Sequence, residues 1–195
     1  MVITDFSQLD LSKSYTYADY LTWQFSEMVE LIRGKVVKMS PAPSSYHQTV
    51  SSNLHGLFWN KLRKSPCRLF AAPSDVRLIR KGKDNEQITT VVQPDLFVVC
   101  DSGKIDEKGC LGSPDLVIEI LSPNSVQQDL NVKFSLYEEA GIGEYWVVFP
   151  GERVVEIFLL EEGKYRLSGH FTENQDIPVN TIPGFSIPGK EVFEW

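Results

Sequence analysis

Residues 115–121, DLVIEIL, constrain the fold more strongly than any other stretch of the sequence. Side chains alternate between the two faces of a strand, and here both faces are apolar apart from the acidic residues. A strand of this kind is typical of the centre of a sheet that is covered on both sides. The strand ends at Leu121, because Ser122-Pro123-Asn124-Ser125 follows and can cap a helix over 126–140. The sequence therefore predicts a buried central strand followed directly by a helix.

The remaining pattern predicts further helices and strands around this centre. Helices are expected over 15–26, with Thr16 as its cap, and over 45–64, with Ser44 or Ser45 as its cap. Strands are expected over 67–80 (interrupted near Pro73), 88–100 and 144–149, with hairpins over 29–40 and over 153–160 with 164–171. Residues 81–85 should form a turn, 101–113 a polar loop and 182–189 an extended tail. This order predicts an α/β fold in which helices flank a mixed central sheet.

Length and composition narrow the classes to which the chain can belong. A chain of 195 residues without repeats or linkers is most simply one domain. No stretch approaches the roughly 18 continuous apolar residues of a membrane helix, and no secretory signal is visible. The three cysteines, Cys67, Cys100 and Cys110, are an odd and scattered set. They favour a reduced, cytoplasmic location over a disulfide scaffold.

The charge of the chain is unevenly distributed. The net charge is −7, with +3 on residues 1–100 and −10 on residues 101–195. The overall acidity argues weakly against bulk binding of nucleic acid. The basic residues cluster between positions 61 and 83, namely Lys61, Arg63, Lys64, Arg68, Arg77, Arg80, Lys81 and Lys83. They are either a solvated helix end and hairpin or a local surface for phosphates, and the sequence leaves both open.

Two acidic residues are expected to meet on neighbouring strands. The tripeptide Pro-Asp-Leu occurs at 94–96 and again at 114–116, each time at the start of an expected strand. Sequential strands usually lie side by side. In the second strand Glu119 interrupts an otherwise apolar run, and burying a lone carboxylate costs several kcal/mol. If it is buried, Glu119 must be neutral, paired or bound to a metal. The alternative to a functional role is a purely structural ion pair, or an edge position that faces water.

The following helix carries a matching basic residue. With Leu130 at the origin of a helical wheel, Lys133 lies at about 300°, inside the arc formed by the apolar residues. Alone, it could snorkel to water or pair with Asp129. Together with Glu119 on the preceding strand, each of the two residues explains the other. His47, which leans toward the core, and Glu30, at the start of an apolar strand, join this set less firmly, since both also suit structural roles.

These residue types suit the hydrolysis of phosphodiesters. Two carboxylates on neighbouring strands offer hard oxygen ligands for Mg²⁺ or Mn²⁺. A nearby lysine can orient or deprotonate a water, or steady charge on a phosphate. Other catalytic signatures are absent from the sequence, including GxSxG, GxGxxG after a strand, the P-loop, HExxH and paired CxxC.

Several segments resemble the PD-(D/E)XK, or restriction-endonuclease-like, superfamily. Pro94-Asp95 matches the PD element and Glu119 the second acid, but Leu121 stands where the lysine is usual. In this superfamily the lysine can migrate to the following helix, where Lys133 lies. More narrowly, the chain resembles the Uma-two family of predicted endonucleases, through segments that cover roughly 15–150. They are Glu30-Leu-Ile-x-Gly34, Met39 to Ser44 with His47-Gln48, Pro94-Asp95-Leu-x-Val-Val, Pro114 to Pro123, and Asp129-x3-Lys133-x3-Tyr137 through Trp146.

The resemblance implies a single nuclease-like domain over 1–195. Its αβββαβ core, about 29–150, would consist of the helix 45–64, the strands 67–80, 88–100 and 115–121, the helix 126–140 and the strand 144–149. An N-terminal helix and hairpin and a C-terminal β extension, about 151–195, would be added to it. Asp95, Glu119 and the backbone carbonyl of Ile120 would hold one Mg²⁺ or Mn²⁺, with Lys133 helping to activate the attacking water. Glu30 and His47 would lie near the site or add to the metal ligands.

The expected function is that of a Mg²⁺-dependent endonuclease of DNA in the cytoplasm. The alternative is a catalytically weak or inactive module on a nuclease fold that binds DNA or a protein partner, which Leu121 and the acidic second half favour. No membrane partner is expected. A homodimer would make a double-strand break easier, with a contact supplied by the strands after 150 and by Tyr145-Trp146.

Overall fold

The computed structural model describes residues 2–39, 44–79, 84–122 and 128–195, which form two six-stranded sheets and one two-stranded sheet. The first sheet has the order β12 (Lys164–Thr172), β11 (Val154–Glu161), β10 (Glu144–Phe149), β9 (Leu116–Ile120), β6 (Leu96–Val99) and β3 (Arg68–Ala71). The second has the order β2 (Lys35–Lys38), β1 (Val29–Ile32), β5 (Val91–Val92), β4 (Val76–Arg77), β8 (Gly109–Leu111) and β7 (Ile105–Asp106). The third pairs β13 (Asp176–Pro178) with β14 (Ser186–Pro188).

The strand expected over 115–121 lies at the centre of the first sheet. β9 pairs in parallel with β10 and antiparallel with β6, and all five of its residues are buried. The sheet is therefore mixed and its central strand is covered on both faces, as the apolar pattern predicts. The α/β class with a mixed, helix-flanked sheet is confirmed.

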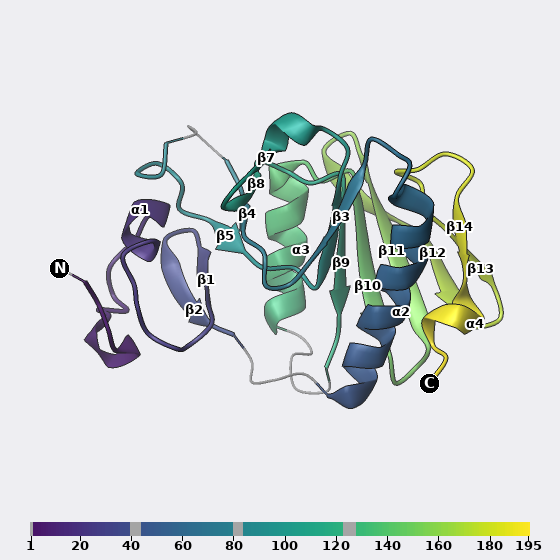
Figure 1. The fold of residues 1–195 in the computed structure, drawn as a ribbon, viewed down its shortest axis with the longest axis horizontal. Helices are drawn as coiled ribbons and strands as arrows, with labels where there is room; N and C mark the ends of the chain where they lie inside the picture. The colour runs from purple at the N-terminus through teal and green to yellow at the C-terminus, as the bar shows by residue number, and fades with distance from the viewer. Residues whose placement is uncertain (1, 40–43, 80–83, 123–127) are drawn as a thin grey trace.

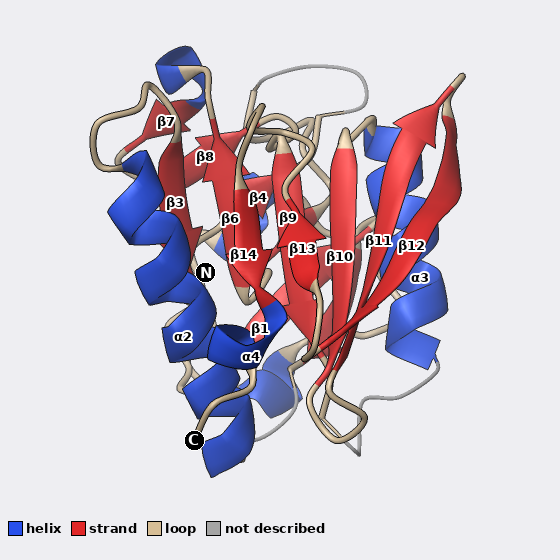
Figure 2. Ribbon diagram, turned by 90° about the vertical axis from the view of Figure 1, so that its right-hand side faces the viewer, coloured by secondary structure: helices blue, strands red, loops and turns tan. Residues whose placement is uncertain are grey.

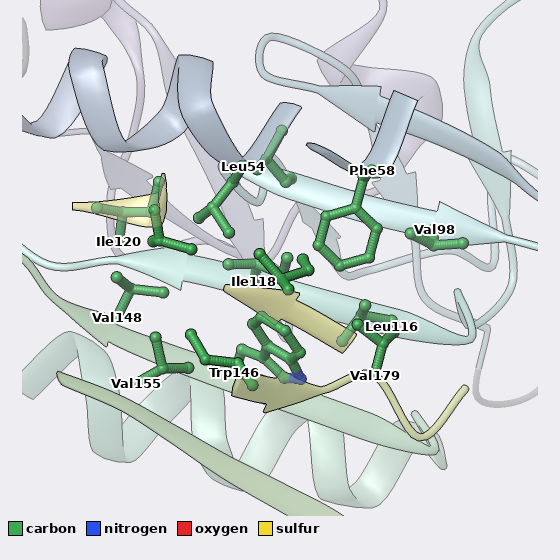
Figure 3. Packing of buried hydrophobic residues seen from close by; sticks show 14 of the residues in the cluster. Leu54, Phe58, Val98, Leu116, Ile118, Ile120, Trp146, Val148, Val155 and Val179 are labelled. Atoms are coloured by element: carbon green, nitrogen blue, oxygen red, sulfur yellow. The ribbon is translucent and has the colours of Figure 1, made fainter. Parts of the chain in front are cut away.

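Two helices cover the two faces of this sheet, and Figures 1 and 2 show them on opposite sides of it. α2 (Ser45–Leu62) packs Leu54 and Phe58 against Ile118 and Trp146, as Figure 3 shows. α3 (Gln128–Ala140) packs Leu136 and Tyr137 against the opposite face, which includes Val117. Each large apolar side chain buried in this way contributes about 1.5–3 kcal/mol to stability. The register of the central strand is thereby determined, since a shift by one residue would exchange the two faces.

The N-terminal hairpin and the start of α2 follow their sequence signals. β1 and β2 pair around Arg33 and Gly34, whose φ angles of 51° and 83° are those of a tight hairpin turn. Ser44 caps α2 by accepting a hydrogen bond from the backbone N–H of His47 at 3.2 Å. The stretch Pro41-Ala-Pro43, the turn residues 81–83 and the cap expected over 123–125 lie outside the described residues.

Two long elements expected from the sequence are broken by proline. The strand expected over 88–100 is split into β5 in the second sheet and β6 in the first, because Pro94 between them has no N–H to donate to a ladder. The strand or strand pair expected over 67–80 is interrupted at Pro73, as expected, and its two parts, β3 and β4, belong to different sheets. At Pro73 and at Pro94 the chain passes from one sheet to the other, and both passages lie beside the start of β6.

Other expectations are wrong in detail. The first helix, α1, covers only Tyr17–Tyr20, although Thr16 caps it as expected. The chain then turns through bonds from Thr22 N–H to Asp19 and from Trp23 N–H to Tyr20, three residues back. The expected loop 101–113 contains a 3-10 turn (Ser102–Lys104), β7 and β8. The tail expected to be extended over 182–189 does contain the strand β14, but its last residue begins a short helix, α4 (Gly189–Val192).

The cysteines differ from their expected reduced state. Cys67 and Cys100 form a disulfide at positions that extend the pairing of β3 with β6 by one residue, and Cys110 is free and buried. The sequence did not reveal this neighbourhood, because the two residues are 33 positions apart. Tyr145 and Trp146 are fully buried, so they cannot form the expected dimer contact. Within the described ranges, no helix has the length and apolar character needed to cross a bilayer.

A buried glutamate attaches the C-terminal extension to the first sheet. Glu144 is 1% exposed, and its Oε1 accepts hydrogen bonds from Trp146 Nε1 at 2.7 Å and from Asn180. Its Oε2 accepts from the backbone N–H and the hydroxyl of Thr181 at 2.6 and 2.7 Å. A buried carboxylate with this many donors is fully compensated for its lost water. Glu144 therefore has a structural role.

We predict that Glu144→Ala lowers the free energy of unfolding by about 3 kcal/mol, since each buried donor left unpaired costs about 1–3 kcal/mol and the losses are not additive. Urea denaturation followed by tryptophan fluorescence measures this value. Glu161→Ala is the control, because Glu161 is exposed and only pairs with Arg166 at 3.3 Å. Its effect should stay within about 0.5 kcal/mol. Equal losses in the two variants would contradict the structural role of Glu144.

Candidate active site

The two acids expected to meet do so at one end of the central strands. β6 pairs with β9 through Leu96 and Ile118, so the next position along this register places Asp95 opposite Glu119. The Oδ2 of Asp95 accepts a hydrogen bond from the backbone N–H of Ile120 at 2.7 Å. Asp95, Glu119 and Ile120, the three expected metal ligands, therefore come together.

The second Pro-Asp-Leu tripeptide has a different role. Asp115 lies just before β9, at the end opposite Glu119, and its Oδ2 accepts a hydrogen bond from the backbone N–H of Cys100 at 2.7 Å. This contact closes the far end of the β6–β9 pair. The two tripeptides look alike in sequence, but only Asp95 is in the group with Glu119.

Lys133 reaches this group from α3. Its Nζ lies 2.9 Å from Oε1 of Glu119 and 3.2 Å from Oε1 of Glu30. The three side chains are 15%, 10% and 6% exposed, respectively, so all three charges are largely withdrawn from water. Glu30, on β1, also accepts a hydrogen bond from the backbone N–H of Gln93 at 2.9 Å. The lysine thus joins the second sheet, the first sheet and α3 at one point.

His47 lies on the other side of Asp95. It is 6% exposed, and its Nε2 is 3.4 Å from Oδ2 of Asp95. Its Nδ1 is buried and has no hydrogen-bond partner among the described residues. All five predicted side chains, Glu30, His47, Asp95, Glu119 and Lys133, are therefore brought to one place from four elements and the start of β6.

The site contains one further side chain that the sequence did not single out for this role. The hydroxyl of Tyr137 donates a hydrogen bond of 2.6 Å to Oε1 of Glu119, and Tyr137 is fully buried. On the helical wheel, Tyr137 belongs to the apolar arc of α3 that faces the sheet. Its position four residues after Lys133 was the available signal, because such residues are neighbours on a helix.

The charges at the site perturb one another. Burial raises the pKa of Glu119 to about 7, and the nearby acids Asp95 and Glu30 add to this, although Lys133 opposes it. Burial alone would lower the pKa of Lys133, but Glu119 and Glu30 raise it well above its usual value. Burial also opposes the charging of His47, yet its contact with Asp95 leaves the pKa of the imidazole raised. Lys133 is therefore held as an ammonium ion.

The basic residues at 61–83 do not border this group. His47 and Lys61 lie 14 residues apart on α2, and a rise of 1.5 Å per residue separates them by about 21 Å along the helix. Arg77 is buried and pairs with Asp106, beneath the ring of Tyr17. Arg80, Lys81 and Lys83 lie outside the described residues. For the described members of the cluster, a phosphate surface beside the site is not supported.

The oxygen atoms of the site suit a hard divalent cation. Asp95, Glu119 and the Ile120 carbonyl would supply only oxygens, which Mg²⁺ and Mn²⁺ prefer. The two hydrogen bonds that described residues donate to Glu119 both end at Oε1. The described residues contain no group of three or more His, Cys, Asp or Glu side chains arranged for a metal. A metal here would thus depend on the Ile120 carbonyl, on water and on substrate phosphate for its remaining ligands.

Three comparisons with known proteins each find similar chains. The model of the Uma2 family, described as "Putative restriction endonuclease", matches residues 17–189. The "Uncharacterized protein slr1290" of Synechocystis is 30% identical over 121 residues, which are 61% of this chain and 60% of that relative's length. A crystal structure described as "a putative nuclease belonging to DUF820 from Anabaena variabilis" has a TM-score of 0.67 at 20% identity. The aligned region covers 92% of this chain and 98% of the Anabaena chain. This structural match confirms the restriction-endonuclease-like fold.

We predict that Lys133→Met lowers the free energy of unfolding by about 3–5 kcal/mol, because it leaves Glu30 and Glu119 buried without their cation. Chemical denaturation of the metal-free protein measures the change. Lys164→Met is a matched control, since Lys164 also contacts a glutamate, Glu138 at 2.7 Å, but is 75% exposed. The control should lose no more than about 1 kcal/mol. An unchanged or increased stability of Lys133→Met would show that the buried lysine does not hold this group together.

Proposed function

This chain belongs to the Uma2 family of restriction-endonuclease-like proteins, and we propose that it is an endonuclease that hydrolyses phosphodiester bonds of DNA with Mg²⁺ or Mn²⁺. The observation that carries the proposal is the convergence of Asp95 and Glu119 beside a buried lysine. Carboxylates and a lysine that perturb one another's pKa values in one place are typical of functional sites. The same residues lie in the region that the family model matches.

Each residue has a chemical role in this proposal. Asp95, Glu119 and the Ile120 carbonyl would hold the cation, which when bound stabilises negative charge on the phosphate and on the leaving oxygen. Lys133 lies against Glu119 and Glu30, and these two carboxylates raise its pKa well above the usual value, which favours a donor role over that of a base. It would instead donate hydrogen bonds that orient the attacking water or steady charge on the phosphate.

Lys133 also accounts for the departure from the usual motif. Leu121, at the position of the usual lysine, is partly buried and packs into the apolar cluster beneath α3. The ammonium group is supplied from α3 and reaches the same carboxylate, Glu119. Glu30 would hold the lysine in place from β1, and His47 would hold Asp95. We further propose that residues 1–195 form one domain, with the core over 29–150 and the β extension over 151–195 bound to it through Glu144.

We predict that Asp95→Asn and Glu119→Gln each reduce the cleavage of plasmid DNA in Mg²⁺ or Mn²⁺ about a hundredfold or more. The reason is that the charge stabilisation by a bound cation is worth several kcal/mol. Asp115→Asn is the control, because Asp115 follows a proline in the same tripeptide but lies at the other end of β9. Calorimetric titration with Mn²⁺ should show binding to the wild type and none to Glu119→Gln.

The alternative function predicts different results in the same experiments. A non-catalytic module that binds DNA or a protein would give no cleavage and no heat of Mn²⁺ binding. The observation that favours this module is that Lys133 already compensates the carboxylate of Glu119. Equal cleavage by the wild type and by Asp95→Asn would contradict the nuclease proposal, whatever the result of the Mn²⁺ titration.

We predict that Tyr137→Phe weakens Mn²⁺ binding by about 10- to 100-fold while the chain keeps its fold. The hydroxyl of Tyr137 orients Glu119, and the loss of such an orienting hydrogen bond typically has this effect on metal affinity. Tyr165→Phe is the matched control, since its buried hydroxyl donates to the carbonyl of Ile142 instead. Calorimetry gives the affinity and circular dichroism the fold. The same Mn²⁺ affinity in both variants would remove Tyr137 from the site.

A further inference from the structure

Two aromatic rings are stacked at the start of α2. The rings of Tyr46 and Trp195 have centroids 5.2 Å apart and planes inclined by 16°. Trp195 is 76% exposed, the largest exposed fraction among the large hydrophobic side chains of the described residues. Tyr46 is only partly exposed and packs against the core. One face of the stack is therefore anchored in the protein, while the indole of Trp195 is open to solvent.

The backbone around Trp195 is held in place by hydrogen bonds to α2. The side-chain amide of Asn53 donates to the carbonyls of Val192 and Glu194, at 3.2 and 2.7 Å. The hydroxyl of Tyr46 donates to the carbonyl of Phe193 at 3.4 Å. These bonds position the residues immediately before Trp195. Trp195 is thus an exposed ring that stacks on a second ring and follows a segment tied to α2.

A cation lies beside the stacked rings. Arg153, in the turn between β10 and β11, is about half exposed and pairs with Glu173. A hydrogen bond to Glu173 is the main cause of the raised pKa of Arg153, and a hydrogen bond to Tyr46 contributes to it. An aromatic face with a guanidinium group at its margin suits a nucleobase and the phosphate attached to it.

The stacked rings lie at the same end of α2 as His47, the residue of the candidate active site on this helix. Tyr46 is the residue before His47, which contacts Asp95. Figure 1 shows the C-terminus beside the first turns of α2, at the same end of the molecule as the tip of β9. A strand of nucleic acid with one phosphate at Asp95 and Glu119 would run along this end of the molecule, where the C-terminal residues lie.

The charge of the chain favours stacking over phosphate contacts as the source of affinity. The net charge is −7, and the described basic residues at 61–68 and Arg77 lie away from the site. Stacking of a base on an aromatic ring needs no net positive charge and tolerates any base. A base within an intact duplex has both faces covered by its neighbours, whereas an unpaired base has a free face.

We propose that Tyr46 and Trp195, with Arg153 at their margin, form a stacking surface for an unpaired nucleobase of the substrate. This inference rests on the proposed nuclease function and extends it, since the preferred substrate becomes a single strand or an unpaired segment and not a continuous duplex. The stack would hold the strand in position beside the carboxylates.

Binding without cleavage tests the stacking surface. The probes are a fluorescein-labelled oligothymidylate strand and a labelled duplex of the same length, titrated in Ca²⁺ and followed by fluorescence anisotropy. Trp195→Ala should weaken binding of the single strand by about 5- to 100-fold, the usual effect of removing one stacking ring, and leave duplex binding unchanged. Trp195→Phe should retain most of the affinity. Trp59→Ala is the matched control, because Trp59 is a 53% exposed tryptophan at a different position on α2.

The outcomes separate this inference from the nuclease proposal. If the wild type binds the duplex as tightly as the single strand, or if Trp195→Ala and Trp59→Ala bind the single strand equally well, the stacking surface is refuted. If the wild type does not bind the single strand at all, the stacking surface is also refuted, and this holds even if Trp195 is found to bind a protein. Cleavage of plasmid DNA that depends on Asp95 would leave the nuclease function standing in all three cases. Conversely, selective single-strand binding without any cleavage would support the stacking surface and refute the nuclease.

Discussion

The ion pairs of Lys133 are the interaction on which the rest of the structure depends. A single buried ammonium group contacts Glu119 on the central strand and Glu30 on the second sheet. Because burial of an unpaired charge costs several kcal/mol, removing one partner leaves the others with an uncompensated buried charge. The cost of separating them therefore holds α3, β9 and β1 together at one point. Tyr137 and Gln93 complete the hydrogen bonds of the two carboxylates. The same arrangement that stabilises the packing of these elements also creates the chemistry of the candidate site.

Pro94 also helps to build the site. Pro94 ends the ladder of the second sheet and lets the chain enter the first sheet with Asp95 as its leading residue. The antiparallel register with β9 then sets Asp95 opposite Glu119. β5 stays in the second sheet, and the backbone N–H of Gln93, directly after it, donates a hydrogen bond to Glu30. The break at Pro94 thus leaves Gln93 bonded to Glu30 and places Asp95 opposite Glu119.

The C-terminal extension serves both the core and the surface. Glu144 binds it to the sheet through Asn180 and Thr181, and β14 and α4 cover the apolar face beside α2. Its last residues return to the first turns of α2, where His47 meets Asp95. A segment that closes the core thereby also places an exposed aromatic ring on Tyr46, at the end of α2 that carries His47. The acidic charge of this half is in part structural, as the buried, fully hydrogen-bonded carboxylate of Glu144 shows.

Local patterns in the sequence determined the central strand, the helices that cover it and the polar residues that stand out within them. Glu119 and Lys133 were predictable because a charge inside an apolar run violates a local rule, whatever the rest of the chain does. Glu30 and His47 joined this set less firmly from their local patterns, which also suit structural roles, and the family resemblance then implied a place for both near the site.

Only the tertiary structure decided which groups these charges meet. The hydroxyl of Tyr137, the partition of 88–100 between two sheets, the pairing of Cys67 with Cys100 and the return of Trp195 to Tyr46 all depend on residues far apart in sequence. Alternation and helical period report which face of an element is buried, but they do not report what lies across from that face. The packing of elements determines the partner, because the partner is chosen by the free energy of the whole core and not by any one segment.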